Sequence, residues 1–365
     1  MRKWLLSVCM ILALIACKDE KSESTRTDIK PVVRIGGLLP LSGGIAHIGE
    51  GAKNGALMAI EKLNSMPNNK YKYEFVYEDI GSSPNKTPTI YNKLVQIDKI
   101  VALTSFNTAV GKIIKPLAFE DKIIHISSAV DNTIGDNAFN YVNSYSIKET
   151  SERLVEYMKK HDMHTISLVA FNHLSTEAVL QVLENVLKTN GIEILSVNRF
   201  NMEQIDFKME ALKIKQENPD MVFMHLVEPS MSLFSKQLLD YGYNGKLSSF
   251  LLFIYSNNPE LFNEQVMIDL REGTDDFNKA YFEKFGVQPQ AASINTYDNV
   301  MLIGKFVEKF QIPDKIDAND MGEKMKEVIE NYMSPRGKMS LDNGLIYTNT
   351  VVKTIKNGKP LIIED

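Results

Sequence analysis

Residues 32–63 constrain the fold of this chain more than any other stretch, because a strand, a loop of small residues and a helix follow each other directly. Val32, Val33 and Ile35 form an apolar, β-branched run that ends at Gly36-Gly37, as expected of a buried strand. The helix that follows has one apolar face, formed by Ala52, Ala56, Ala59, Ile60 and Leu63. The stretch therefore predicts the first unit of an open α/β sheet, in which ligands bind at the helix start beside the carboxyl end of the strand.

The same alternation continues along the chain in two series. The first is expected to contain strands 71–77, 100–103 and 123–126 and helices 87–96 and 109–120, the second helix being capped by residues 104–108. The second is expected to contain helices 148–160, 175–188, 207–217 and 229–241 and strands 165–171, 193–197 and 221–226. Two such series predict an α/β protein of two Rossmann-like lobes with parallel sheets and a ligand cleft between them.

The amino terminus predicts export and lipidation. Arg2-Lys3 precede an apolar run that ends at Cys17 and is too short to cross a bilayer, which is typical of a signal peptide. Because Leu14-Ile15-Ala16-Cys17 resembles a bacterial lipobox, we expect a lipoprotein signal peptide at 1–16, an acylated Cys17 and a flexible tether at 17–30. The alternative is an ordinary signal peptide that happens to contain a cysteine. Lys18 leaves the choice between inner and outer membrane open.

Composition excludes several classes of function. The net charge of −5 becomes −7 once Arg2 and Lys3 are removed, so the chain lacks the basic charge that is typical of nucleic-acid-binding proteins. Cys9 lies inside the signal, so the mature chain has no pair of cysteines to form a disulfide. The six histidines show no metal-ligand spacing beyond one pair on a predicted turn, and we find no catalytic constellation. We therefore expect no enzyme activity, no metal and no cofactor.

A dinucleotide-binding fingerprint is an alternative reading of the first unit. Gly49-Glu50-Gly51, Gly55 and the later acidic pair Glu78-Asp79 imitate it. The fingerprint requires its first glycine in the turn that directly follows the strand, whereas nine residues separate Pro40 from Gly49. The imitation is therefore poor, and we prefer a different family.

The motifs are similar to those of substrate-binding proteins of branched-chain amino-acid and amide ABC transporters, which have the type I periplasmic-binding-protein fold. The opening Leu38-Leu39-Pro40-Leu41-Ser42-Gly43-Gly44, followed by Gly49 and Gly55-Ala56, resembles the signature of that family. Tyr297-Asp298 at the start of an apolar helix, and the Asn-Gly turns at 343–344 and 357–358 around strands 345–347 and 351–355, resemble its carboxyl-terminal part. The resemblance covers residue 32 to the carboxyl terminus, patchily but in the family's order.

The resemblance implies discontinuous lobes, because in this family the chain crosses between them three times. We expect crossings near residues 146, 274 and 349, with lobe 1 formed by 31–145 plus 275–348 and lobe 2 by 146–274 plus 349–365. The segment 264–276 is shorter than usual, which predicts a missing or truncated peripheral strand in lobe 2.

The resemblance also implies which residues bind the ligand. In lobe 1, Ile48 stands where an aromatic residue is usual, and Asn107-Thr108 stand where the family has a pair of serines. Ala129 falls on a backbone contact. Asp131 stands where a threonine hydroxyl is expected, unless the correspondence is shifted by one or two residues and Thr133 takes that place. In lobe 2, Val227-Glu228-Pro229 falls on an aromatic pair before proline, and Leu251 on the glutamate that would bind an ammonium. Phe106 and Tyr297 complete the predicted ligand-binding set.

The departures from the pattern make leucine-like ligands doubtful. Leu251 cannot bind an ammonium, and Asp131 would repel a carboxylate. If Asp131 and Glu228 both faced the cleft, they would favour a ligand with an amine or several hydrogen-bond donors. For each acid, a solvated loop position is an equal alternative.

The resulting expectation is a monomeric, lipid-anchored receptor of the cell envelope, facing the periplasm. It would bind a small polar ligand, amino-acid- or amide-like, between its lobes and deliver it to ABC permease subunits. The alternative is an envelope regulator that keeps the fold but binds no ligand. Apolar filling of the cleft by Ile48, Phe106, Val227 and Leu251 would favour this alternative.

Overall fold

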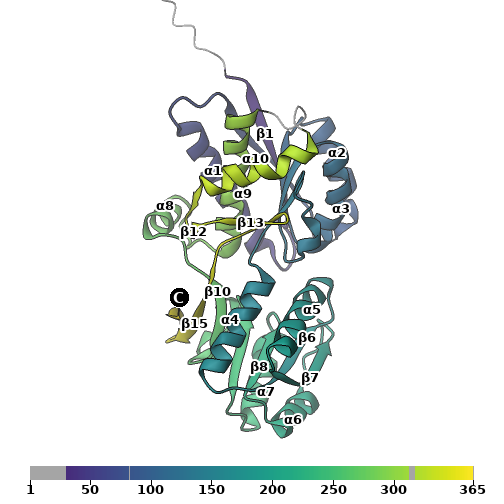
Figure 1. Ribbon diagram of the computed structural model, residues 1–365, viewed down its shortest axis with the longest axis vertical. Coiled ribbons are helices and arrows are strands. Elements are labelled where there is room, and N and C mark those ends of the chain that lie inside the picture. Colours follow the sequence, from purple (N-terminus) through teal and green to yellow (C-terminus); the bar gives the residue numbers. More distant parts are fainter. Residues whose placement is uncertain (1–29, 82, 312–316, 365) are drawn as a thin grey trace, which may run out of the picture. The chain divides into compact units, whose positions relative to one another are not determined.

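The computed structural model describes residues 30–81, 83–311 and 317–364, and residues Pro31–Asp365 form one compact unit. The predicted signal peptide, Cys17 and almost all of the predicted tether lie outside the described residues. Within the compact unit the described strands form two seven-stranded sheets and one two-stranded sheet (Figure 1). The predicted α/β fold with two lobes is confirmed. We call the parts built on the first and second large sheets lobe 1 and lobe 2.

Lobe 1 is built on a sheet with the order β13-β14-β5-β4-β3-β1-β2. All neighbouring strands are parallel except the antiparallel pair β13 and β14. Its strands are β1 (Val32–Leu39), β2 (Lys72–Asp79), β3 (Ala102–Phe106), β4 (Ile124–Ser128), β5 (Asn140–Asn143), β13 (Ser340–Asp342) and β14 (Leu345–Tyr347). Its helices are α1 (Ala46–Ser65), α2 (Thr87–Gln96), α3 (Thr108–Glu120), α8 (Asp275–Phe285), α9 (Ala291–Phe310) and α10 (Ala318–Glu330), with short 3-10 turns η1 (Pro84–Lys86) and η2 (Asn132–Ile134).

Lobe 2 repeats this architecture with the order β16-β15-β10-β9-β8-β6-β7, in which β15 is antiparallel to both of its neighbours. Its strands are β6 (Thr165–Phe171), β7 (Glu193–Phe200), β8 (Met221–His225), β9 (Lys246–Phe250), β10 (Val266–Leu270), β15 (Thr350–Lys356) and β16 (Lys359–Glu364). Its helices are α4 (Ile147–Lys160), α5 (Leu174–Thr189), α6 (Lys208–Glu217) and α7 (Ser230–Asp240), with turns η3 (Phe253–Tyr255) and η4 (Pro259–Phe262). The segment 264–276 supplies β10 to the sheet interior, and the expected loss or truncation of a peripheral strand stays a prediction.

The chain changes sheet three times. It leaves the first sheet after β5, returns after β10 and leaves again between β14 and β15, where Thr348 and Asn349 join the two strands. The short β11 (Met333–Ser334) and β12 (Gly337–Lys338) form the two-stranded sheet. The exact domain boundaries given above stay a prediction.

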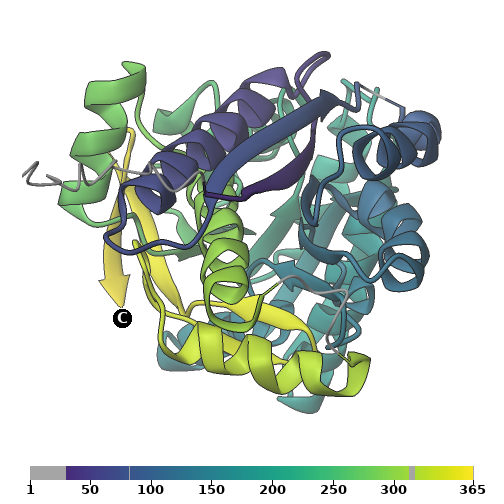
Figure 2. The ribbon, with the colours of Figure 1, turned by 90° about the horizontal axis from the view of Figure 1, so that it is seen from above.

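Helix α1 packs along α9, and glycines allow the close approach (Figure 2). A Cβ on Gly55 would lie 1.9 Å from the backbone oxygen of Ser293, and a Cβ on Gly304 would lie 2.4 Å from Leu63. Gly49 serves a similar purpose, since its Cβ would lie 2.0 Å from the Pro40 oxygen at the end of β1. These glycines therefore allow close packing of the helices. That role explains why Gly49 and Gly55 resemble a dinucleotide fingerprint although no phosphate-binding role is needed for them.

Two local predictions were wrong. The predicted cap 104–108 belongs mostly to β3, which runs to Phe106. Thr104 and Ser105 are buried in the sheet, where Ser105 hydrogen-bonds other buried polar groups. Within this stretch, Asn107 alone caps α3. Helix α9 begins at Ala291, six residues before Tyr297, with a capping box at Gln290. Polar residues misled the sequence reading in both cases, because they are satisfied inside the fold.

Buried polar groups connect neighbouring strands in lobe 1. His125 on β4 is fully buried, with Nδ1 2.8 Å from the Asn140 amide oxygen and Nε2 2.8 Å from the Ser105 hydroxyl. Burial lowers the pKa of His125 to about 4, although Asn140 and Asp136 favour the protonated form. The imidazole is therefore neutral at pH 7 and donates from Nδ1 to the amide oxygen.

A second buried group links β10 to β15 in lobe 2. Lys353 is 1% exposed, and its Nζ lies 2.8 Å from Asp269 and 2.7 Å from Glu272. Burial raises the pKa of Asp269, and the Lys353 charge opposes that shift. The lysine therefore compensates an acid that would otherwise be buried alone.

Candidate functional site

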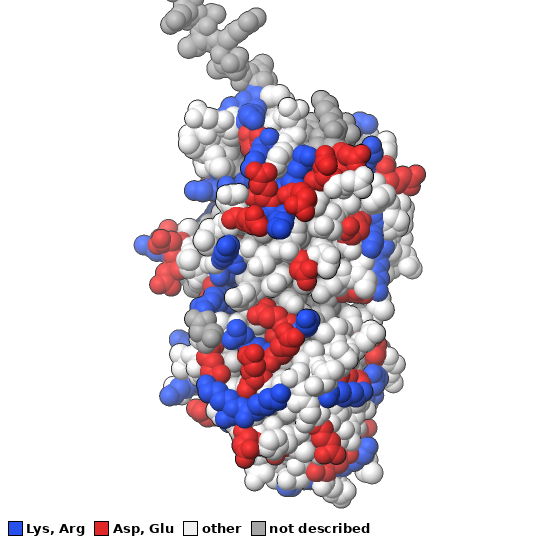
Figure 3. Space-filling model, viewed as in Figure 1, with Lys and Arg blue, Asp and Glu red and all other residues white. Residues whose placement is uncertain are grey.

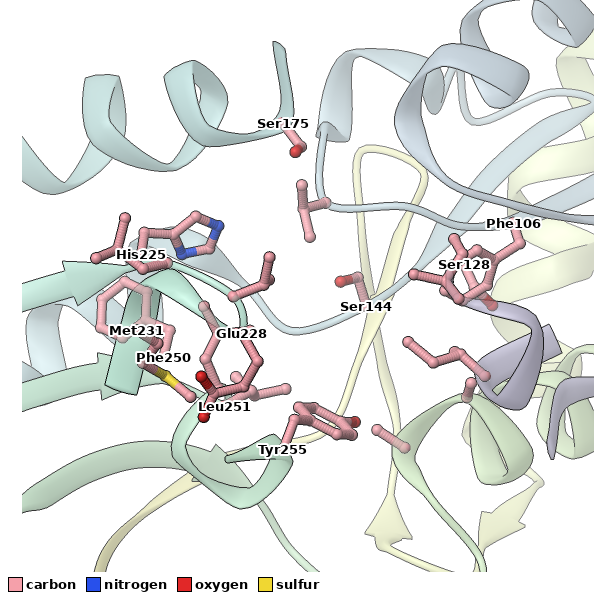
Figure 4. A pocket seen from close by; sticks show the side chains of 18 of the residues that line it. Phe106, Ser128, Ser144, Ser175, His225, Glu228, Met231, Phe250, Leu251 and Tyr255 are labelled. Carbon is pink, nitrogen blue, oxygen red and sulfur yellow. The ribbon is translucent and has the colours of Figure 1, made fainter. Parts of the chain in front are cut away.

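The carboxyl ends of the parallel strands in both lobes border one cavity of about 620 Å³ (Figure 4). In lobe 1, lining residues follow β1, β3, β4 and β5, and in lobe 2 they follow β6, β8, β9 and β10. In lobe 1 the strand order reverses at β1, which lies between β3 and β2. In lobe 2 it reverses at β6, which lies between β8 and β7. The carboxyl edge at such a reversal is the usual ligand position in open α/β sheets.

The lobe 1 wall is mostly apolar. Its apolar residues come from the loop before α1, the ends of β3 and β4, and the start of α9: Ile45, Ile48, Phe106, Ala129, Val130, Ala291 and Ala292. Polar groups are few, and most have protein partners. Ser128 accepts a hydrogen bond from Asn299, and Asn295 accepts one from Arg336. The hydroxyl of Ser144, which follows β5, has no partner among the described residues and points into the cavity (Figure 4).

The lobe 2 wall also has a large apolar part. It is formed by the ends of β8 and β9 and by the start of α7, with Leu226, Val227, Met231, Phe250, Leu251 and Leu252. Tyr145, which enters lobe 2 from β5, packs edge-on against Phe250 with ring centroids 6.2 Å apart. Burial raises the pKa of Tyr255 to about 12, so its hydroxyl faces the cavity as a neutral group. The cavity thus offers mainly hydrocarbon and aromatic surface to a ligand.

Glu228 is the only Asp, Glu, Lys or Arg among the described residues that line the cavity, and protein groups already surround its carboxylate. Oε1 accepts hydrogen bonds from the Ser232 hydroxyl at 2.5 Å, the Ser256 hydroxyl at 2.8 Å and the Asn257 backbone N–H at 3.0 Å. Oε2 accepts one from the Ser232 backbone N–H at 3.2 Å. The carboxylate therefore holds the loop after β9 against the start of α7.

His225, the last residue of β8, lines the cavity and has an unsatisfied ring. Its Nδ1 is buried without a hydrogen-bond partner, and no hydrogen bond joins Nε2 to another described residue. Burial, with a smaller effect of His173, lowers the pKa of His225 to about 4. The ring is therefore a neutral donor and acceptor at pH 7.

A strained residue stands at the cavity edge of each lobe. Asn107, after β3, has φ +69°, and Leu251, after β9, has φ +60°. The Asn107 side chain offsets part of the strain by capping α3, since its amide oxygen accepts a hydrogen bond from the Val110 backbone N–H at 3.0 Å. Leu251 has no comparable local hydrogen bond from its side chain. Such strain in a non-glycine residue is often found at ligand sites.

Six of the ten predicted ligand-binding residues line the cavity: Ile48, Phe106, Ala129, Val227, Glu228 and Leu251. The four apolar residues expected to fill the cleft, Ile48, Phe106, Val227 and Leu251, border an empty volume instead, so the filled cleft that would favour a ligand-independent regulator is not observed. Whether any of the six contacts a ligand stays a prediction.

The other four predicted residues do not line the cavity. Asp131 forms a 2.6 Å ion pair with Lys112 and accepts from Thr133, and the hydrogen bonds and the charge outweigh burial and lower its pKa. Tyr297 packs against Phe277 with ring centroids 5.0 Å apart. Asn107 caps α3, as described above. Neither Asp131 nor Glu228 therefore presents a free acid to the cavity, which removes the reason to favour an amine ligand.

Thr108 differs from these three, because its buried hydroxyl has no partner. The residue is 3% exposed and begins α3, two positions after Phe106. The first N–H groups of a helix also lack partners within the helix. The hydroxyl is enclosed by the protein and does not reach the cavity, so a contact between Thr108 and a ligand stays a prediction.

Sequence reasoning missed the lining residues His225, Ser144, Tyr145, Phe250 and Tyr255. His225 carried a usable signal, since it is a histidine at the end of an otherwise apolar strand. The others follow β5 and β9, two strands that were not predicted. No group of three or more possible metal ligands occurs among the residues that the structure describes. No helix in the described ranges is long and apolar enough to cross a membrane.

Charges of both signs are interspersed on the face of the molecule seen in Figure 3, without one continuous basic surface. This distribution agrees with the acidic net charge and with the expectation that the chain does not bind nucleic acid.

Comparison with known proteins identifies the family. The model of the periplasmic binding protein family matches residues 32–359. A leucine-binding protein from Thermotoga maritima has a TM-score of 0.77 and 19% identity over 90% of this chain and 97% of its own. A solute-binding protein from R. palustris in complex with benzoate has a TM-score of 0.75 and 18% identity over 91% and 96%. A branched-chain amino-acid transporter substrate-binding protein from Streptococcus pneumoniae in complex with isoleucine has a TM-score of 0.76 and 16% identity over 92% and 100%.

At these identities the structural matches show a shared fold, whereas the family match covers most of the chain. Members of the family are exported, non-enzymatic receptors that bind solutes for ABC transporters, so the expectation of a binding protein rather than an enzyme is confirmed. The chain belongs to the periplasmic binding protein family.

Proposed function

We propose that this protein captures a small amide-like solute in the cavity between its lobes and delivers it to an ABC permease. The observation that carries the proposal is the cavity of about 620 Å³ at the carboxyl ends of both sheets, where walls from two lobes can enclose a ligand. Closure of lobe 1 (31–145 plus 275–348) on lobe 2 (146–274 plus 349–365) would make the liganded form distinct for the permease.

Of the two ligand classes expected from the sequence, the site favours the amide-like one. An amide carbonyl could accept from the Ser144 hydroxyl, which points into the cavity without a partner among the described residues. An amino acid would also need a free acid for its ammonium, and Glu228 is already hydrogen-bonded four times. The relatives bound to isoleucine and benzoate show that this fold accepts both apolar and carboxylate groups.

A thermal-shift screen tests the proposal. The purified protein would be heated with amides, amino acids, polyamines and short carboxylates. A ligand at one hundred times its Kd stabilises the folded state by about 2.7 kcal/mol, which the melting temperature reports. Ser144→Ala should weaken binding of a carbonyl ligand, whereas Ser65→Ala, the same change at an exposed position at the end of α1, should not.

The screen also separates the two functions. Stabilisation by a solute, weakened in Ser144→Ala, would support the receptor. A protein that melts cooperatively but responds to no solute would contradict it and favour the ligand-independent envelope regulator.

We further propose that acylated Cys17 anchors the protein to the membrane with the receptor body facing the periplasm. Lipid on one residue next to a flexible tether would hold the receptor close to its permease and raise its effective concentration there. Cys17→Ser should move the protein from the membrane to the soluble fraction. If the substituted protein still sediments with membranes, the anchor lies elsewhere.

A further inference from the structure

His225 is a polar residue in a wall that is mostly apolar. It ends β8 and borders the cavity together with Leu226, Phe250 and Leu251. Its Nδ1 is enclosed by the protein without a partner, whereas Nε2 is the ring nitrogen that a molecule in the cavity can reach, and no described residue bonds it. Polar groups within an apolar wall normally have a hydrogen-bond partner. A bound solute can supply the partner that Nε2 lacks.

The charge state of the ring restricts that solute. Burial and the nearby His173 lower the pKa of His225 to about 4, so the ring is neutral at the pH of most cells. A neutral imidazole either donates or accepts one hydrogen bond at Nε2, depending on its tautomer, and an amide or a hydroxyl group can supply the matching acceptor or donor. It provides no charge to compensate a ligand's ion.

The rest of the lobe 2 wall offers a protonated amine only one acid, which protein donors already hold. Glu228 is the only acid that lines the cavity in the described part of the chain, and its carboxylate faces Ser232, Ser256 and the Asn257 backbone. An ammonium placed against Leu251 or Phe250 would lose its water without gaining a partner. A solute with an apolar body meets no such cost.

We propose that His225 is the residue with which lobe 2 selects its ligand: it hydrogen-bonds an uncharged amide or hydroxyl group on a solute of otherwise apolar surface, and the pocket rejects solutes that carry a protonated amine. This inference rests on the proposed receptor function and specifies the ligand class.

A matched series of probes tests it by calorimetry on the full chain. Benzamide, benzyl alcohol, benzylamine and phenylalanine share one ring and differ in the polar group. We expect benzamide and benzyl alcohol to bind at least tenfold more tightly than benzylamine and phenylalanine. Equal or tighter binding of either amine would overturn the proposal.

Substitutions show whether His225 acts through its hydrogen bond. His225→Leu should weaken benzamide binding at least tenfold, and His225→Gln, which keeps a donor and an acceptor, should restore most of it. His164→Gln is the control, since His164 is an exposed residue that pairs only with Asp162. Cooperative melting of each variant excludes misfolding, and unchanged affinity in a folded His225→Leu protein would refute the role.

The outcome for the receptor function is separate. If the probes do not bind, the solutes found in the thermal-shift screen are sorted by whether they carry a protonated amine. Hits that are mainly amines, or that bind His225→Leu normally, overturn the selection by His225 but leave the receptor function standing. If no solute stabilises the protein at all, both proposals fall.

Discussion

Acidification should destabilise the folded protein through His125, and the magnitude follows from its environment. The folded-state pKa is about 4, whereas an unfolded histidine titrates near 6.5. As the pH falls through 6.5, the unfolded chain takes up a proton that the folded chain does not accept until about pH 4. The stabilisation is therefore fully present above pH 6.5 and is lost progressively below it. Linkage gives a loss of about 1.8 kcal/mol between pH 7 and pH 5 from this one residue.

The assay is urea unfolding of the wild type and His125→Gln at pH 7 and pH 5. Total stability is not the test, because Asp298, with a pKa raised to about 6 by burial, acts in the opposite direction over the same interval. The difference between the two proteins isolates His125. The variant should be less stable at pH 7, since His125 bonds Asn140 and Ser105, but it should lose about 1.8 kcal/mol less than the wild type on acidification. An equal loss in both proteins would refute the assignment of a neutral, buried His125.

Three further predictions concern packing, charge and strain. Gly55→Ala should lower the unfolding free energy by about 1 to 3 kcal/mol, because its Cβ would overlap the backbone of α9. Gly44→Ala, whose Cβ would have no atom within 4 Å, should be nearly neutral, and equal effects of the two changes in urea unfolding would contradict this packing. Lys353→Met should cost about 3 to 5 kcal/mol by leaving Asp269 buried without its cation, and adding Asp269→Leu should recover most of the loss in the same measurement. Leu251→Gly should relieve about 1 kcal/mol of backbone strain at the positive φ of this residue. The melting temperature of the free protein should therefore stay close to that of the wild type, whereas the affinity for the solute should fall. Unchanged affinity would exclude Leu251 from the ligand wall.

The regular part of the fold could be predicted from the sequence. Residues 165–171 and 345–347 are strands and 87–96 a helix with the predicted bounds, because apolar periodicity and turn residues agree there. Strands β5 and β9 were not predicted, because Asn140, Asn143 and Ser248 are polar residues buried inside the sheets. Their burial depends on partners from distant segments, for example Asn299 on α9 for Asn143, and no local pattern reveals such pairs.

The site was predicted in position but only partly in chemistry. The sequence indicated some of the strand ends that border the cavity, since carboxyl ends of parallel strands share one edge of a sheet. It could not show that Asp131 pairs with Lys112, or that Glu228 turns toward Ser232 and Ser256. Both acids were expected as possible ligand contacts, whereas each is held by protein partners in the structure. The orientation of a loop acid depends on neighbours that sequence spacing does not reveal.

The third passage of the chain between the sheets has a consequence for biosynthesis. Lobe 1 lacks one edge of its sheet until β13 and β14 are made, and lobe 2 lacks β15 and β16 until residues 350–364 follow. Helix α9, which packs along α1, is also made only after the first ten strands. Neither lobe can therefore finish folding until its late strands have been synthesised. The chain stays incompletely folded over most of its synthesis, a property that suits a protein that passes through a narrow translocation channel before it folds.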